Sequence, residues 1–374
     1  MSHCPCVDDG SNLQRSRISG LKRIMSYEID AFLGQRSDLE VWNQRFRSVA
    51  ICSVAQELAL APLTSDFLEE LRTGLRLQGE AEQQVAEAWG TEASRSATVA
   101  FISAGYFGGA GGQEAVVWTN GVVVRRNIDI NEALRLLGVR KEPGRDEFDT
   151  VGLGQYRSNA AWAAAAIIDA LLEEKGDPVD ILTGALKYPA SSSVQERVRA
   201  HAAKLLGERG AERSVGALLE AAQKDEHYGV RLAATLALAR IGESGIPALL
   251  LLLANTSGND LWSAIHALGK AGPAAGPAVP VLARMLKKER DENRRAAAEA
   301  LGKLGEVARP AIPALVEALV DSDEFLRYNA AEALGNVAQP GDRIVIAALG
   351  RALRDRYKEV PKIAAASLKK LQQE

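Results

Sequence analysis

The sequence predicts an α+β N-terminal domain with a small, mostly antiparallel sheet, followed by an all-α solenoid of stacked helix pairs. A recurring small residue and a recurring proline predict the solenoid, and a change of hydrophobic period before residue 150 separates the first domain from it. A short helix pair cannot bury its own apolar face, so a chain that repeats one must stack its neighbours. The small residue recurs every 30 to 33 residues, at Gly207, Ala239, Gly269, Gly302 and Gly335.

Each repeat has a first helix, a glycine break and a second helix. A second mark lies three residues after the first, at Gly210, Gly242, Gly272, Gly305 and Ala338. Both marks are expected at the end of the first helix, because glycine adopts the left-handed conformation that a helix C-terminus favours. Pro247, Pro280 and Pro313 are expected to open the second helix, where a missing N–H is harmless.

Arginines begin most of the first helices and acidic residues precede them. The arginines are Arg199, Arg231, Arg294 and Arg327, and the acidic residues are Asp225, Glu226, Asp291, Glu292, Asp321 and Asp323. Carboxylates suit helix N-termini and bind guanidinium groups well. We therefore expect an Asp-to-Arg ladder between stacked loops.

These motifs resemble the HEAT-repeat family, particularly its short bacterial type, which also occurs in phycobilisome-lyase-like proteins. The shared pattern is VRxxAAxALGxxG, then PALxxAL, then an acidic turn, and the resemblance covers about residues 155–374. It implies an armadillo-like superhelix that binds proteins. The N-terminal domain resembles no family that we recognise.

The predicted boundaries are a disordered tail over residues 1–24, the α+β domain over 25–140, a linker over 141–154 and the solenoid over 155–374. The linker (KEPGRDEFDTVGLG) is charged and aperiodic, although its partly apolar end could instead pack against the first repeat. The first helix pair is expected at Asn159–Leu172 and Pro178–Leu186.

Short apolar runs define the elements of the first domain. Strands are expected at Val49–Cys52, Leu58–Ala61, Ala97–Phe107 and Glu114–Trp118, with a hairpin turn at Thr119-Asn120-Gly121. Helices are expected after Thr64, over Ala81–Trp89 and over Ile130–Gly138.

A glycine-rich segment is the most conspicuous part of this domain. It contains Gly105, Tyr106, Phe107, Gly108, Gly109, Gly111 and Gly112. A phosphate-binding loop leads from a strand into a helix, whereas the residues that follow here favour a strand. We expect a turn or bulge between two strands, and a ligand or partner loop is the alternative.

No catalytic, cofactor or metal site is expected. None of His3, His201, His227 and His266 precedes a glutamate, so the di-iron activity of the HEAT-repeat enzyme deoxyhypusine hydroxylase does not carry over. His201 and His266 are expected to be packed or half-exposed. Cys4, Cys6 and Cys52 cannot form a disulfide framework, and no signal or membrane-spanning run is evident. A cytoplasmic location is expected.

Charge gives little support to nucleic-acid binding. The chain has a formal net charge of −3 with 25% charged residues. The basic residues between Arg284 and Lys303 alternate with acidic ones, which is typical of a solvated, self-paired face.

Equivalent positions of the second helices suggest a partner-binding surface. One phase holds Glu220, Leu251, Arg284, Glu317 and Arg351, and its last three members alternate in sign, which predicts a lateral charge ladder. The run Leu249–Leu253 is apolar all round, so at least one leucine should face outward. The hypothesis is that the concave surface near Leu250 and Leu251 docks an apolar part of a partner. The alternative is that the N-terminal domain covers it.

These observations favour a non-enzymatic interaction or scaffold protein that binds a protein partner through the concave face of the solenoid. The alternative is an enzyme or enzyme accessory of the lyase-like branch, with a small-molecule pocket where the two domains meet, near the segment Gly105–Gly112.

Overall fold

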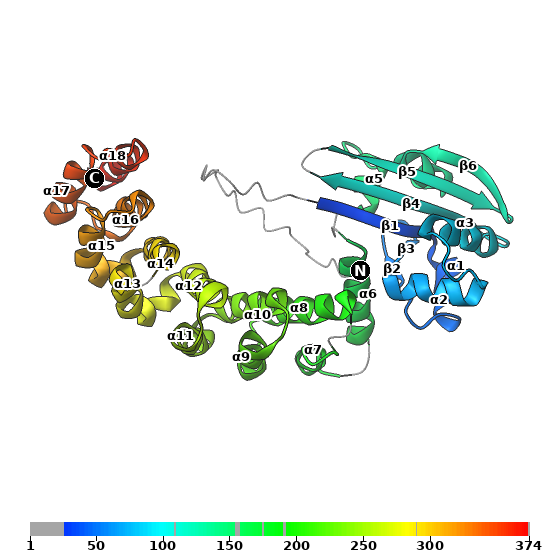
Figure 1. The fold of residues 1–374 in the computed structure, drawn as a ribbon, viewed down its shortest axis with the longest axis horizontal. Helices are drawn as coiled ribbons and strands as arrows, with labels where there is room; N and C mark the ends of the chain where they lie inside the picture. Colours follow the sequence, from blue (N-terminus) through cyan, green and yellow to red (C-terminus); the bar gives the residue numbers. More distant parts are fainter. Residues whose placement is uncertain are drawn as a thin grey trace. The chain divides into compact units, whose positions relative to one another are not determined.

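The computed structural model describes residues 26–107, 110–153, 158–173, 176–189, 192–288 and 290–372 (Figure 1). The predicted tail over residues 1–24 and the candidate ligands His3, Cys4 and Cys6 lie outside these ranges. The chain forms two compact units, Met1–Glu173 with Ser191–Arg197 and Glu174–Ala190 with Val198–Glu374.

The first unit contains an antiparallel sheet, as predicted, and the sheet has six strands. Its strands are β1 (Ser26–Gln35), β2 (Cys52–Ser53), β3 (Leu58–Pro62), β4 (Thr98–Phe107), β5 (Ala110–Thr119) and β6 (Val122–Ile128), in the order β2-β3-β1-β4-β5-β6. The expected hairpin turn after Thr119 is confirmed, because Asn120 and Gly121 both have positive φ angles, of 54° and 76°. The strand expected at Val49–Cys52 reduces to Cys52–Ser53.

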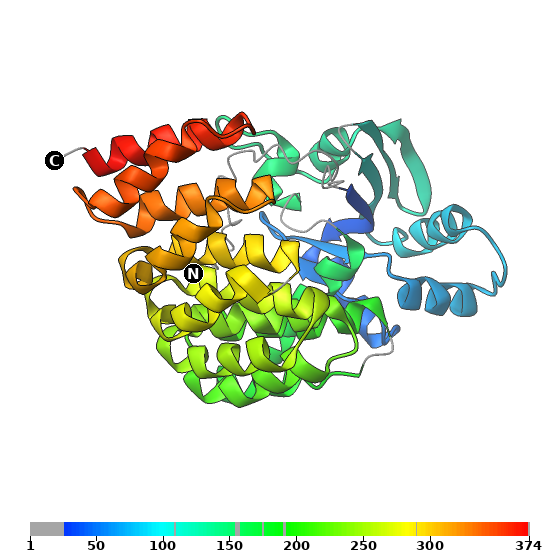
Figure 2. The same ribbon diagram turned by 60° about the vertical axis from the view of Figure 1, so that its left-hand side comes forward.

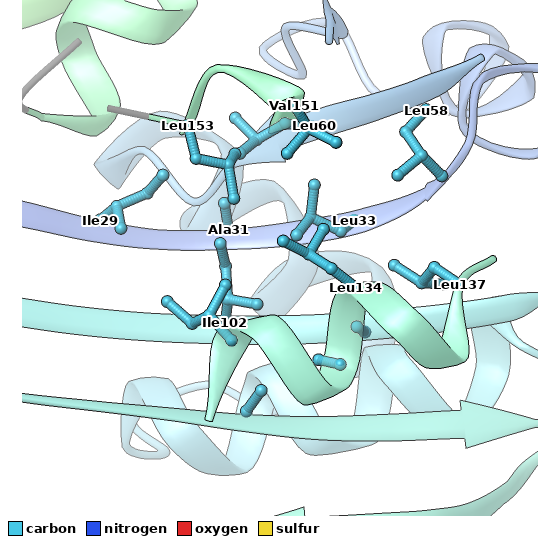
Figure 3. Packing of buried hydrophobic residues seen from close by; sticks show 14 of the residues in the cluster. Ile29, Ala31, Leu33, Leu58, Leu60, Ile102, Leu134, Leu137, Val151 and Leu153 are labelled. Atoms are coloured by element: carbon cyan, nitrogen blue, oxygen red, sulfur yellow. The ribbon is translucent and has the colours of Figure 1, made fainter. Parts of the chain in front are cut away.

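Helices cover both faces of this sheet. One face packs on α1 (Arg36–Glu40), α2 (Ser65–Leu75) and α3 (Glu82–Ala93), and its core contains Phe32, Phe67 and Trp89. The other face packs on α4 (Ile130–Leu136), α5 (Glu147–Val151) and α6 (Asn159–Glu173). Side chains alternate between the two faces along β1. Ile29, Ala31 and Leu33 therefore lie in the core beside α4, α5 and α6 (Figure 3), whereas Phe32 lies in the core beside α1, α2 and α3.

Residues 141–153 belong to the first unit and do not form the predicted linker. Asp146 caps α5 by accepting a hydrogen bond from the backbone N–H of Asp149 at 2.8 Å. Val151 and Leu153 are buried beside Leu60 and Leu134 against the sheet (Figure 3). The apolar end of the segment is therefore part of the core, and residue 154 lies outside the described ranges.

Helix α6 also belongs to the first unit, whereas the sequence placed it in the first solenoid repeat. Its Trp162 is buried in the same core as Val151, and the carbonyl oxygen of Trp162 accepts a hydrogen bond from the Cys52 thiol at 3.2 Å. At the start of α6, Asn159 accepts a hydrogen bond from the Asp30 N–H and donates one to the Leu63 carbonyl, each at 3.0 Å. These bonds tie α6 to β1 and to the end of β3.

The second unit is the predicted stack of helix pairs. Its first helices are α8 (Ser193–Glu208), which belongs to this unit from Val198 on, α10 (Tyr228–Ile241), α12 (Gly258–Ala271), α14 (Asp291–Leu304), α16 (Glu324–Val337) and α18 (Glu359–Gln372). Its second helices are α7 (Pro178–Ala185), α9 (Val215–Lys224), α11 (Ile246–Asn255), α13 (Val279–Lys288), α15 (Ile312–Ala318) and α17 (Arg343–Ala352). Figure 2 shows these pairs stacked one on another.

The two recurring small positions have different roles. Four residues of the second mark end the first helices in a positive φ, as expected, with values between 60° and 82° at Gly210, Gly242, Gly272 and Gly305. Ala338 ends α16 in an extended conformation instead, with a φ of −79°. The first mark lies inside the helices, where it permits close helix approach. A Cβ on Gly207 would lie 2.7 Å from the Cα of Ala237 on the next first helix, and one on Gly302 would lie 3.0 Å from the Cα of Ala333.

The close packing of the first helices sets the curvature of the solenoid. The first helices contact one another more extensively than the second helices do. They line the inner side of the curve, while α9, α11, α13, α15 and α17 lie along its outer side (Figure 1). A stack whose layers have unequal spacing must bend toward the more closely spaced layer.

The expected Arg–Asp ladder joins neighbouring repeats. Arg199 binds Asp225, Arg231 binds Asp260 and Arg327 binds Asp355, each with two N–H···O bonds between 2.7 and 3.2 Å. In the fourth rung, Arg294 and Arg295 bind Asp321 and Asp323. The guanidinium group of Arg199 also donates to the carbonyls of Tyr188 and Pro189. Arg231 and Arg327 donate to loop carbonyls in the same way, so these three rungs fix a loop as well as a neighbouring repeat.

The segment Tyr228–Asn255 is long and apolar enough, by composition, to cross a membrane. It is not one continuous helix, because the 3-10 turn Gly242–Gly245 separates α10 from α11. The two helices pack against each other as one repeat of the stack.

Candidate partner-binding surface

The residues proposed from the second helices lie on the outer side of the solenoid, not on its concave side. Leu251 is 44% exposed on α11, which confirms that one leucine of the run faces outward, and Leu250 is half-buried. Arg284, Glu317 and Arg351 are exposed on α13, α15 and α17. The placement was wrong because the close approach of the first helices curves the stack toward them (Figure 1).

The predicted lateral charge ladder takes a different form. Glu317 pairs with Lys287 of the preceding second helix, with the Lys287 Nζ and the Glu317 Oε2 2.5 Å apart. Glu220 pairs within its own helix, with Lys224 at 3.3 Å. Both pairs are exposed, and such pairs contribute at most about 1 kcal/mol.

The inner side of the solenoid carries a stripe of accessible side chains that repeats at i and i+4 on successive first helices. The buried side chains of each first helix face the rest of the stack, so its accessible side chains face the inner side of the solenoid. We call this set the inner stripe; its central members are Leu232, Leu236, Trp262, His266, Arg295, Glu299, Tyr328 and Glu332. The stripe is apolar on α10, aromatic on α12 and charged on α14.

Trp262 and His266 form a stacked pair at the centre of the inner stripe. Their ring centroids are 5.1 Å apart and their planes differ by 7°. Burial and then the positive charge of Lys303 lower the pKa of His266, which favours the neutral imidazole. The indole of Trp262 is 40% exposed, which leaves a large aromatic surface in contact with water.

The Arg–Asp ladder is interrupted at the same repeat. Leu261 stands on α12 where Arg231 and Arg294 stand on the neighbouring first helices. Beside it lies a hollow of about 610 Å³, lined by Ser257, Gly258, Asn259, Leu261, Trp262, Arg290, Glu292 and Asn293. A leucine cannot donate the hydrogen bonds that the arginines of the ladder donate to the next repeat. The hollow extends the accessible surface around Trp262.

The glycine-rich segment is the end of the β4–β5 hairpin, which confirms the expected turn between two strands. Gly105 pairs with Gly112, Tyr106 with Gly111 and Phe107 with Ala110. Gly108 and Gly109 lie outside the described residues. Because a strand follows the turn, no helix N-terminus is placed to hold a phosphate.

The described residues contain no group of three or more His, Cys, Asp and Glu side chains that could hold a metal ion. Cys52 is buried and forms no disulfide, and burial raises the pKa of its thiol far above the usual range. A buried neutral thiol is a poor nucleophile. His201 is half-buried on α8, as expected, and burial lowers its pKa.

The family model of HEAT repeats matches residues 185–269 and 280–369. The solenoid described above is therefore a stack of HEAT repeats. The match begins 30 residues after the start expected from the sequence, in agreement with the place of α6 in the first unit. The family model does not match residues 1–184, and no curated protein sequence is significantly similar to the chain.

Several solved structures resemble the chain. The phycocyanin lyase CpcE–CpcF complex from Nostoc sp. PCC7120 is 20% identical, with 41% of this chain and 98% of that chain covered and a TM-score of 0.36. The HEAT-like repeat protein from Thermococcus onnurineus NA1 is 18% identical, with 53% and 82% covered and a TM-score of 0.36. Human deoxyhypusine hydroxylase is 22% identical, with 65% and 96% covered and a TM-score of 0.29. The family assignment rests on the repeat model alone.

Proposed function

We propose that the HEAT solenoid is a non-catalytic scaffold that binds a protein partner along the inner stripe, with Trp262 as the anchor of the contact. The exposure of the Trp262–His266 pair supports this proposal most directly. Tryptophan is enriched among the residues that dominate binding energy at protein interfaces. The flat stacked pair offers one apolar surface already held in place.

The surroundings of Trp262 indicate what kind of segment would fit. Leu232 and Leu236 lie on the preceding first helix, and Arg295 and Glu299 lie on the following one. A partner segment would match this surface if it placed an apolar side chain against the indole of Trp262. It would then need polar groups that pair with the positive charge of Arg295 and the negative charge of Glu299. Such mixed rims set orientation and partner choice more than affinity.

Affinity purification with the tagged full chain tests the proposal. We expect a stoichiometric partner that is lost with Trp262→Ala and kept with Val320→Ala, which removes a more exposed apolar side chain outside the inner stripe. Both variants should remain folded and unfold cooperatively in thermal unfolding, because more than a third of each side chain is exposed. Equal capture by the Trp262→Ala variant would overturn the proposal, and loss only with Leu251→Glu would place the contact on the outer side.

The second candidate is an enzyme accessory with a small-molecule site near the β4–β5 hairpin. A cavity on the strands of this hairpin supports it. A coloured or metal-bearing purified sample would favour this candidate over the scaffold.

A further inference from the structure

A second accessible site lies entirely within the N-terminal unit, on the face of the sheet that α3 covers. It is a cavity of about 220 Å³. Its walls are formed by Asp30 of β1, Phe101 and Ser103 of β4, Glu114, Ala115, Val116 and Trp118 of β5, and Glu82, Gln83 and Glu87 of α3. This volume is below the range of about 300 to 1,000 Å³ that is typical of drug-sized ligands, so an occupant would be small.

Strand register brings the acidic groups to one row of the sheet. Asp30 lies opposite Ser103, and Ser103 lies opposite Glu114. The next row on the same face of the sheet holds Phe101 and Val116 as a directly opposed pair. Directly opposed side chains point to the same face of a sheet, so two carboxylates stand beside an apolar floor.

Negative charge exceeds positive charge around this cavity. Glu87 is neutralised by Arg126 of β6, whose Nη1 is 2.5 Å from the Glu87 Oε1. Asp30, Glu82 and Glu114 remain. Partial burial raises the pKa of Glu82, and the charge of Asp30 raises it further. The charge of Asp30 therefore disfavours the ionised form of Glu82, and a cation in the cavity would relieve that repulsion.

Trp118 completes the apolar floor of the cavity. Its side chain lines the cavity and is only 1% exposed. With Phe101 and Val116, it offers an apolar surface beside the carboxylates to the carbon chain of an occupant.

The spacing of the carboxylates favours an organic cation over a metal ion. Asp30 and Glu114 lie two strands apart, and neighbouring strands are separated by about 4.8 Å, so their Cα atoms are roughly 10 Å apart. Metal ligation needs oxygens within about 2 to 2.6 Å of one centre. No cluster of that kind occurs among the described residues.

We propose that this cavity binds an aliphatic ammonium group, held between Asp30 and Glu114 with its carbon chain on Phe101, Val116 and Trp118. The shared chemistry is that of a free diamine and of a lysine side chain. The site is independent of the inner stripe of the solenoid, so either proposal can fail without the other.

Isothermal titration calorimetry of the full chain with 1,4-diaminobutane tests this site. We expect saturable one-to-one binding that Glu114→Gln weakens at least tenfold. Glu114 is exposed, so the variant should keep the unfolding temperature of the unchanged protein. Glu306→Gln, which removes an exposed carboxylate of the solenoid, is the charge-matched control and should bind like the unchanged protein.

Two further probes distinguish a free diamine from a lysine side chain, and a charged occupant from an uncharged one. Tighter binding of N-acetyl-lysine methylamide than of 1,4-diaminobutane would identify a lysine side chain as the occupant, and the reverse order would identify a free diamine. n-Butanol should not bind. The proposal is overturned if neither amine binds saturably, or if Glu114→Gln and Glu306→Gln bind the amines equally.

Discussion

At the scale of single residues, the arginines of the ladder satisfy several groups at once. Arg327 is buried, and its guanidinium group donates two hydrogen bonds to Asp355 of the next loop and two more to the carbonyls of Asp321 and Ser322. Removing such a residue leaves a partly buried carboxylate and two carbonyls without their donor. Loss of one partner of a buried pair costs more than the pair itself contributes.

We expect Arg327→Met to lower the free energy of unfolding by about 3 kcal/mol at pH 7. The hydrogen bond from Arg327 holds the pKa of Asp355 below its usual range. This contribution is present above the pKa of an unfolded aspartate, about 3.9, and is lost as the pH falls through the folded pKa. The difference between Arg327→Met and the unchanged protein should therefore shrink below about pH 4, as measured by urea denaturation across pH.

Arg213→Met provides the matched control, because Arg213 forms an exposed pair with Asp177. Its effect on the free energy of unfolding should be much smaller than that of Arg327→Met, because water screens an exposed pair. Equal effects of the two variants would mean that the ladder does not join the repeats.

At the scale of elements, helix spacing depends on residues without a side chain. Gly207 lies in the last turn of α8, where a Cβ would meet the backbone of Ala237 on α10. Gly350 lies in the last turn of α17, and nothing lies within 4 Å of a Cβ built there. The two glycines share a helical setting and differ in what surrounds them.

We expect Gly207→Ala to lower the free energy of unfolding by about 1 to 3 kcal/mol, because α8 and α10 would have to separate. Gly350→Ala should raise it by about 0.5 to 1 kcal/mol, since alanine is the better helix former. Thermal or urea unfolding of both variants measures the contrast. A gain of stability in both would show that close packing of the first helices is not what spaces the stack.

The repeat elements could be predicted from sequence, whereas their curvature could not. Glycines, prolines and arginines recur at fixed phases and locate each helix pair. Hydrophobic period alone does not say which layer of helices is more closely spaced. Glycine inside a helix costs about 1 kcal/mol of stability, so its recurrence there indicates that close packing requires it. Gly207, Gly269, Gly302 and Gly335 therefore indicated that the first helices are the closely spaced layer. The inner stripe, with Trp262, was missed for the same reason.

Two other elements were misassigned because their sequences fit more than one setting. Helix α6 begins NAAWAAAAII, which is apolar on most sides and can cover a sheet as well as join a solenoid. Strand β1 was not predicted as a strand, because it is central in the sheet and buried on both faces over Ala31–Leu33, so its pattern does not alternate.

At the scale of the whole molecule, the boundary of the first unit lies near residue 173. A fragment of residues 26–173 keeps Val151, Leu153 and Trp162 against the sheet, whereas one of residues 26–140 exposes that face. We expect the longer fragment to unfold cooperatively and the shorter one to aggregate. Size-exclusion chromatography and thermal unfolding compare them. Equally cooperative unfolding of both fragments would restore 141–154 as a linker.

The central claim is that a partner binds the inner side of the HEAT solenoid around Trp262. Hydrogen–deuterium exchange of the full chain, free and with its captured partner, tests it most directly. The account predicts slower exchange in α10, α12 and α14 on binding, with no change in α11 and α13. Protection confined to α11 and α13 would contradict it.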